Sequence, residues 1–348
     1  MKTKKKEKKK LSFATILLIL FLTIILLITS TYAWFTANKT VTIDSINIKV
    51  ASTSGLEISS NGIDWKNILS NAEIINPTNY NNHINQFPPI LKPVSSDGKV
   101  DTNGKMNVYY GEITSNPTTG DYIVSSIKQT DTKGQEGHYV AFDIFLKIEQ
   151  DSPIYLTTDS NVIVMEDEID KGLQNSSRIA FVMQGDEALD AAPVTVQNTR
   201  NLVNNKNVYI WEPNSNIHNT SAASQISLYG ATINDKTSTD GVARGATTYY
   251  GLSREFSDID MKSLMLGTNG TLGNYISTME SSANGVKLLT TSQDFRTYQE
   301  LFSIRRGITK IRVYLWIEGQ DIDNENSVSG SGISYNIHLS KVPSETGN

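Results

Sequence analysis

Apolar and polar residues alternate along several stretches of this chain, and the alternation predicts β-strands. In 332–339, isoleucine, tyrosine and leucine occupy every second position, and serine, asparagine and histidine lie between them. Stretches 308–318 and 139–149 follow the same pattern. A period of two residues places one set of side chains against a core and the other toward solvent. Shorter β-branched and aromatic runs predict strands at Ile154–Thr157, Asn161–Met165, Arg178–Met183 and Asn207–Trp211.

Near the start of the chain the alternation changes phase by one residue. Val41 and Ile43 have one parity, whereas Ile46, Ile48 and Val50 have the other. A shift of this kind predicts a β-bulge, or a strand that crosses between two sheets. The third interpretation is that a flexible leader joins the first core strand here.

The distribution of the strands favours an all-β fold, a jelly-roll-like β-sandwich. We expect one domain over residues 34–348, because its first and last strands look like parts of one sheet system. Two domains in tandem are the alternative. Stretches 61–136 and 213–299 are rich in turn-forming residues, so we interpret them as long insertions of loops and short helices. Short helices are expected at Asp186–Ala191, Asp258–Met265 and Asp294–Leu301.

The first 33 residues have the layout of an export signal. Seven lysines precede the apolar segment from Leu11 to Ile28, and Thr31 and Ala33 are small residues at −3 and −1 of a cleavage site. We predict that a signal peptidase cleaves between Ala33 and Trp34. Without cleavage, residues 11–28 would form an N-terminal hydrophobic helix that anchors a single-pass protein in the membrane.

Removal of the lysine-rich start leaves an acidic chain. Residues 1–33 hold seven of the 31 basic and one of the 36 acidic residues, so the remainder has a net charge of −11. An acidic surface disfavours nucleic acid as a partner. The chain contains no cysteine, so an exported form is held together without disulfides. This combination is typical of Gram-positive bacteria, and we expect a protein secreted from such a cell or displayed on its surface.

No catalytic motif stands out, and we expect a protein that is not an enzyme. The absence of cysteine excludes a thiol nucleophile, and neither His-Glu-x-x-His nor Gly-x-Ser-x-Gly occurs. A hydrolase that uses carboxylates such as Glu166, Asp167 and Glu168 is a minor alternative, because acidic runs are usually solvated. The four histidines lie in loops, before a strand or on a polar strand face: His83, His138, His218 and His338.

Two acidic loops are candidates for binding calcium as a cofactor. Just past a predicted strand, acidic residues occupy every second position: Asp321, Asp323 and Glu325. Carboxylates in such a tight turn can converge on a hard cation. A second candidate loop combines Asp97, Asp101, Asn103 and Gly104. Aspartate, asparagine and glycine also favour turns, so turn formation is the alternative in both loops.

Aromatic residues occupy the outward positions of two predicted strands. Tyr314 and Trp316 lie beside Arg312 on one strand, and Tyr209 and Trp211 lie on another. Exposed aromatic rings could stack on sugars or contact another subunit. The favoured interpretation is that the insertions cover this face and make the aromatic side chains a second layer of core.

The junction Thr31-Tyr32-Ala33-Trp34-Phe35-Thr36, directly after a long apolar segment, resembles the signal-peptide end of exported TasA/camelysin-like proteins, which a SipW-type signal peptidase processes. Strand 313–321 is similar to a C-terminal strand of related clostridial-type surface proteins. The resemblance implies a jelly-roll-like sandwich that assembles into biofilm-matrix fibres, in which one subunit's N-terminal segment completes the sheet of its neighbour. The candidate donor is Trp34–Val50, with Trp34, Phe35, Val41 and Ile43 as assembly residues.

Together these features favour a structural, self-associating surface or matrix protein. Its expected partners are further copies of itself, neighbouring surface proteins and the signal peptidase, and also the membrane if residues 11–28 are retained. The alternative function is a cell-surface module that binds carbohydrate or calcium through the outward aromatic residues or an acidic loop.

Overall fold

The computed structural model describes most of the chain after residue 40. The described residues are 41–51, 55–134, 137–164, 173–200, 208–218, 243–244, 250–260, 275–278, 285–319, 321, 323–324 and 332–341. The predicted N-terminal helix Leu11–Ile28, the cleavage residues Ala33 and Trp34, and the assembly residue Phe35 lie outside them. Within the described ranges, no helix is both long and apolar enough to cross a bilayer.

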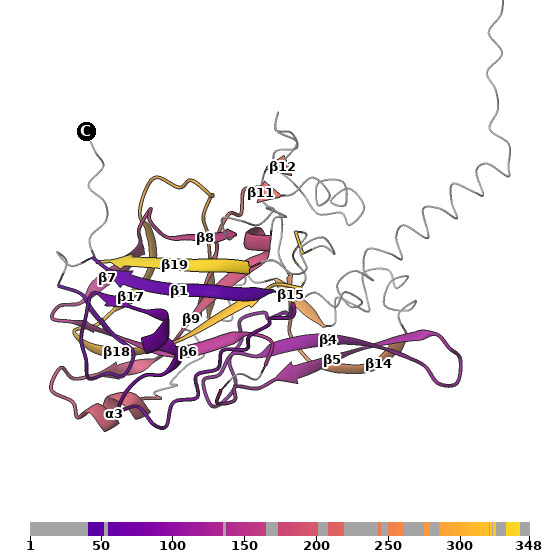
Figure 1. Cartoon of the computed structure of the whole chain (residues 1–348), viewed down its shortest axis with the longest axis horizontal. Helices are drawn as coiled ribbons and strands as arrows, with labels where there is room; N and C mark the ends of the chain where they lie inside the picture. The colour runs from indigo at the N-terminus through magenta and orange to yellow at the C-terminus, as the bar shows by residue number, and fades with distance from the viewer. Residues whose placement is uncertain are drawn as a thin grey trace, which may run out of the picture.

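Two six-stranded sheets pack against each other and form the body of the molecule (Figure 1). The first sheet has the order β17 (Gln299–Ile304), β7 (Ser152–Leu156), β19 (Gly332–Ser340), β1 (Thr42–Val50) and β3 (Ile68–Leu69), and β8 (Asn161–Val164) also pairs with β19. The second has the order β16 (Val286–Thr290), β10 (Val208–Glu212), β9 (Ser177–Glu187), β18 (Gly307–Ile317), β6 (Val140–Ile148) and β2 (Glu57–Ser59). The predicted all-β sandwich is confirmed.

The main core lies between the two sheets and consists of the residues that period-two alternation places inward. One apolar cluster contains side chains that are inaccessible to solvent and come from both sheets: Ile144 of β6, Val313 and Leu315 of β18, and Ile48 of β1. Burial of a side chain of this size contributes about 1.5–3 kcal/mol, so the alternation is the main determinant of which strand face points inward.

The first and last described strands lie side by side in the first sheet (Figure 1). β1 pairs with β19 in parallel, from Thr42 opposite Gly332 to Val50 opposite Leu339. The register shifts between Ile43 and Ser45, which is the β-bulge that the phase change predicted.

The insertions contain more strand than expected. β4 (Val108–Ser115) and β5 (Tyr122–Gln129) form a hairpin in the first insertion, and β14 (Phe256–Asp260) of the second pairs with β5. These three strands form a ribbon that extends away from the sandwich (Figure 1). The expectation of loops was therefore wrong for this part of 61–136. Further short strands are β11 (Ile217–His218), β12 (Ala243–Arg244), β13 (Tyr250–Leu252) and β15 (Ile276–Thr278).

The three predicted short helices do not form in the residues that the structure describes. Strand β14 occupies 256–260 and strand β17 occupies 299–304, because both segments pair with strands distant in sequence. Strand β9 continues to Glu187. Such pairing overrides local propensity and cannot be read from a short window. The described helices are α2 (Asn71–Ile75), α3 (Pro193–Asn198) and the 3₁₀ turn η2 (Leu173–Ser176).

The first insertion covers the outer face of the second sheet. Tyr314 and Trp316 of β18 are fully buried there in a second apolar cluster, together with Val94, Met106 and Val108 of the insertion. The interpretation of these outward aromatics as a second layer of core is confirmed. Trp211 is also fully buried but belongs to the main core, and Tyr209 packs against it.

Candidate functional site

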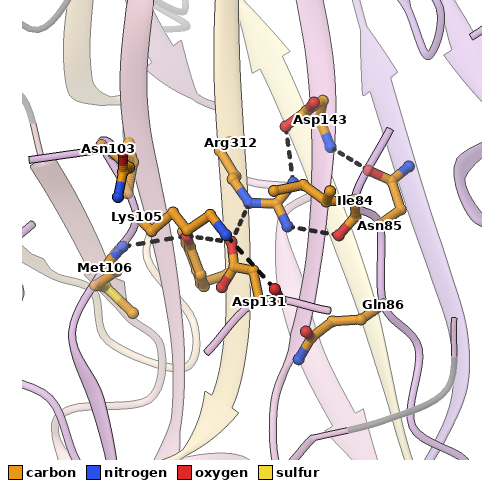
Figure 2. A network of polar contacts seen from close by, with 12 residues as sticks. Ile84, Asn85, Gln86, Asn103, Lys105, Met106, Asp131, Asp143 and Arg312 are labelled. Atoms are coloured by element: carbon orange, nitrogen blue, oxygen red, sulfur yellow. Dashed lines mark hydrogen bonds and ion pairs between the residues drawn. The ribbon is translucent and has the colours of Figure 1, made fainter. Parts of the chain in front are cut away.

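A buried network of charged side chains lies between the outer face of the second sheet and the first insertion (Figure 2). Its centre is Arg312 of β18. The guanidinium donates from Nε to Asp131 Oδ2 at 2.7 Å, from Nη1 to Asp143 Oδ1 at 2.9 Å and from Nη2 to the carbonyl of Ile84 at 2.9 Å. Arg312 and Asp143 are each only 3 % exposed. Two carboxylates and a backbone carbonyl thus accept the hydrogen bonds that the Arg312 guanidinium would otherwise donate to water.

A second cation, Lys310, extends the network on the same face of β18. Its ammonium group donates to the hydroxyl of Tyr80 at 2.9 Å and to the carbonyl of Gln197 at 2.5 Å, and it lies 3.4 Å from Asp143 Oδ2. The Tyr80 hydroxyl donates to the same Asp143 oxygen at 2.6 Å. Asn79 precedes Tyr80 in a left-handed conformation, with φ 57°, which asparagine tolerates well and which forms part of the turn leading to Tyr80.

Two further tyrosines bind the other carboxylate. Tyr139 donates to Asp131 Oδ1 at 2.6 Å and Tyr314 donates to Asp131 Oδ2 at 2.9 Å. The Tyr314 oxygen in turn accepts from the amide of Met106 at 3.1 Å. Residues of β6, β18 and the insertion are therefore joined by polar contacts in addition to apolar packing.

The charges of the network set the protonation of its members. Burial alone would raise the pKa of the Asp143 carboxyl, but Arg312 and Lys310 outweigh burial and lower that pKa to about 2. Burial lowers the pKa of Lys310, although Asp143 opposes this effect. Burial and the neighbouring Asp143 raise the pKa of Tyr80. Asp143 is consequently ionised at neutral pH and acts as a counter-ion, since a carboxyl of such low pKa is a poor proton acceptor.

A polar cavity of about 320 Å³ opens above this network. Among the described residues, four cationic side chains line it, Lys105, Arg200, Lys310 and Arg312, and one carboxylate, Asp143. Amide side chains make up much of the remaining wall: Asn82, Asn103, Gln184, Gln197 and Asn198. The lining offers hydrogen-bond donors and positive charge, which suits the binding of a polar ligand.

The acidic loop predicted to bind calcium lies at a different buried site. Asp321 forms an ion pair with Arg178, which is also 3.4 Å from Glu212. Asp321 Oδ1 accepts from the amide of Asp323 at 2.8 Å, as in an Asx turn. The third predicted ligand, Glu325, lies outside the described residues, so calcium binding by this loop stays a prediction.

The second acidic loop is organised by its own hydrogen bonds. Asp101 Oδ1 accepts from the amides of Asn103 at 2.8 Å and Lys105 at 3.0 Å, and Asp97 forms an ion pair of 2.5 Å with Lys99. Among the described residues, no group of three or more histidine, aspartate or glutamate side chains is arranged to hold a metal ion.

The histidines occupy separate places. The His138 ring stacks on Tyr110 with centroids 4.2 Å apart, and burial lowers its pKa to about 4. His83 is partly buried near Tyr80, with ring centroids 5.9 Å apart. His338 lies 3.1 Å from Asp159 Oδ2. The side chain of His218 and the acidic run 166–168 are not among the described parts.

The predicted assembly residues that the structure describes are Val41, which directly precedes β1, and Ile43 within it. Val41 is fully buried and bridges to Leu91, and Ile43 is partly buried against the main core. The charge network, by contrast, was not predicted, because alternation assigned Arg312 and Asp143 to solvent-facing positions. The available signal was the large aromatic residues that share the outer face of 308–318, since a solvated face rarely carries both tyrosine and tryptophan beside a charge.

Comparisons of the chain with protein-family models, with curated proteins and with solved structures gave no match.

Proposed function

We propose that this is an exported structural protein that self-associates by donating its N-terminal strand, β1, to a neighbouring copy. The observation that supports this most is the position of β1. It is the first strand that the structure describes, yet it lies inside a sheet, between β19 and β3. A strand in such a place can be exchanged between copies, because the same element fills the same position in either arrangement.

The contacts of β1 are concentrated on one neighbour and on the core. It pairs with β19 along its length, and Ile46 and Ile48 are fully buried. On its other side, the pairing with β3 is limited to Ile48 and Lys49. A copy of β1 from another subunit would repeat these contacts residue for residue, so assembly of this kind requires no additional interface.

The export signal and the resemblance to TasA/camelysin-like proteins support a location outside the cell and a role in biofilm-matrix fibres. Cleavage after Ala33 would free the segment that begins with Trp34 and Phe35 and leads into β1. The proposal therefore predicts filaments of the cleaved form, residues 34–348, in electron micrographs. A monodisperse monomer at high protein concentration would contradict it.

Strand exchange can be distinguished from other kinds of association by disulfide trapping. Asn47 of β1 is the register partner of Asn336 of β19, and their side chains are hydrogen bonded at 3.3 Å. Because the chain lacks cysteine, the double variant Asn47→Cys/Asn336→Cys introduces a single defined pair. If β1 is donated, oxidised filaments will give a ladder of covalent oligomers on non-reducing gels.

A matched control uses the other neighbour of the same residue. Asn336 also pairs with Asn161 of β8, with the Asn336 amide donating at 2.8 Å. Because β8 is not exchanged in the proposed assembly, Asn161→Cys/Asn336→Cys will crosslink within one chain in filaments and monomers alike. A ladder from both pairs, or from neither, would show that filaments form in another way.

A further inference from the structure

The polar cavity above the charge network has the composition of a binding site that strand donation does not use. In the part of the chain that the structure describes, four cations and one carboxylate line it, and the second carboxylate of the network, Asp131, is ion-paired with Arg312 at 2.7 Å. The local balance is therefore positive, whereas the whole chain has a net charge of −5. Positive charge gathered in a concave site of an otherwise acidic protein attracts anions.

The floor of the cavity is held rigidly. Every nitrogen of the Arg312 guanidinium donates to a protein oxygen, and the Lys310 ammonium contacts Tyr80, Gln197 and Asp143. These groups cannot rearrange without leaving a buried charge uncompensated. Their two cations are balanced by Asp131 and Asp143, so they provide a fixed base for a ligand, as pre-organised sites require, and the excess positive charge of the cavity comes from Lys105 and Arg200.

The rim, in contrast, carries polar groups that remain accessible. Arg200 is exposed, and the Lys105 ammonium is partly exposed and makes only a long contact, 3.5 Å, with the carbonyl of Asp131. Lys105 lies beside Arg312 (Figure 2), and Asn103 lines the same cavity. The exposed amide side chains of Asn82 and Asn198 also line the cavity. The rim residues come from three separate segments of the chain that the fold brings together.

The chemistry of this lining selects a class of ligand. Amide side chains both donate and accept hydrogen bonds and so match the vicinal hydroxyls of a sugar, while Lys105 and Arg200 match a carboxylate. Among the lining residues that the structure describes, Ile84 is the one aliphatic side chain, which disfavours an apolar ligand. The volume of about 320 Å³ lies at the small end of the range of ligand sites and suits a single sugar residue.

We propose that this cavity binds a uronate, the carboxylated residue of an acidic saccharide. Lys105 and Arg200 pair with its carboxylate, and the amides of Asn82, Asn103 and Asn198 bind its hydroxyls. This inference is independent of strand donation, and it differs from sugar stacking on Tyr314 and Trp316, which are buried.

The test is calorimetric titration of the full-length protein with glucuronate, glucose, inorganic phosphate and a short oligouronate. Glucose has the hydroxyls without the carboxylate, and phosphate has the charge without the hydroxyls. We expect saturable binding of glucuronate that weakens as salt is added, and binding of glucose and phosphate weaker by at least about tenfold. Comparison of glucuronate with the oligouronate shows whether the natural source is a free sugar or a polymer.

Variants then assign the binding to the cavity. Lys105→Gln/Arg200→Gln changes two accessible side chains and should weaken glucuronate binding at least about tenfold with an unchanged unfolding midpoint. The matched control Lys287→Gln removes an exposed cation on β16 and should leave binding unchanged. Absence of glucuronate binding, equal binding of phosphate or glucose, or full binding by the double variant would each overturn the proposal.

Discussion

Arg312 and Asp143 are register partners on adjacent strands, β18 and β6, and their side chains form a buried ion pair of 2.9 Å on the outer face of the second sheet. The pair lies at the base of the candidate site and beneath the first insertion. Its formation depends on the insertion, because Asp131 and the carbonyl of Ile84 satisfy the other donors of Arg312.

Removal of the Asp143 charge should strongly destabilise the protein. Asp143→Asn leaves two buried cations, Arg312 and Lys310, with one fewer counter-ion, and breaking a buried pair typically costs about 3–5 kcal/mol. The free energy of unfolding from urea titration measures this. The control Asp159→Asn removes a carboxylate whose side chain is 75 % exposed and should change stability by less than about 0.5 kcal/mol. Equal effects of the two substitutions would contradict a structural role for the pair.

Acidification should loosen the contact between His138 and Tyr110. Burial, with a smaller contribution from Lys92, lowers the pKa of His138 to about 4, below the value near 6.5 expected in the unfolded chain. Between these two pKa values the unfolded state binds more protons than the folded state. The contribution of the neutral His138 ring to the free energy of unfolding is therefore fully present above about pH 6.5 and is lost as the pH falls toward 4. We expect a loss on the order of 1 kcal/mol for this partly buried ring.

The measurement is urea unfolding at pH 7 and pH 4.5 for the unchanged protein and for His138→Phe. Phenylalanine retains an aromatic ring opposite Tyr110 but cannot titrate. The variant should show a weaker dependence of stability on pH between these values. The same dependence in both proteins would place the titrating group elsewhere.

Substitution of Gly251 should separate the two insertions. A Cβ at Gly251 would overlap the carbonyl oxygen of Ser96. Beside this contact, the amide of Asp97 donates to the carbonyl of Leu252 at 3.0 Å, and the amide of Leu252 donates to the Ser95 hydroxyl at 2.9 Å. Gly251→Ala should therefore cost about 1–3 kcal/mol and increase amide hydrogen exchange in 95–97 and 250–252. Gly120→Ala is the control, because its Cβ meets open space and only its positive φ is strained, at about 1 kcal/mol. Unchanged exchange in Gly251→Ala would contradict the contact.

Deletion of the bulge residue in β1 should be tolerated. Asp44 is the residue passed over when the register shifts between Ile43 and Ser45, so its deletion leaves both neighbours opposite the same partners in β19. We expect a change within about 1 kcal/mol, measured by thermal or urea unfolding. Deletion of Asn47 instead reverses the faces of the preceding residues, including the buried Val41 and Ile46. That deletion should cost several kcal/mol, and equal losses from the two would contradict the register.

Features that depend on residues close together in the sequence could be predicted, whereas features that depend on distant residues could not. Alternation is a property of consecutive residues. It therefore predicted strands β6, β18 and β19 and the bulge in β1. The ribbon of β4, β5 and β14 was not predicted, because β14 and β5 are paired across more than a hundred residues. The same holds for the candidate site. Arg312 and Asp143 follow the pattern of solvated residues, and only the distant insertion buries them.

The parallel pairing of β1 with β19 also has a consequence for folding kinetics. Asn47 and Asn336, which are in contact, are 289 residues apart in sequence, so this part of the sheet has a very high contact order. During synthesis from the N-terminus, β1 cannot pair with β19 until residues 332–340 have been made, and closure across so long a sequence separation is intrinsically slow. The topology thus sets up a competition between intramolecular closure and capture of a strand from elsewhere, and the concentration of newly made chains decides between them.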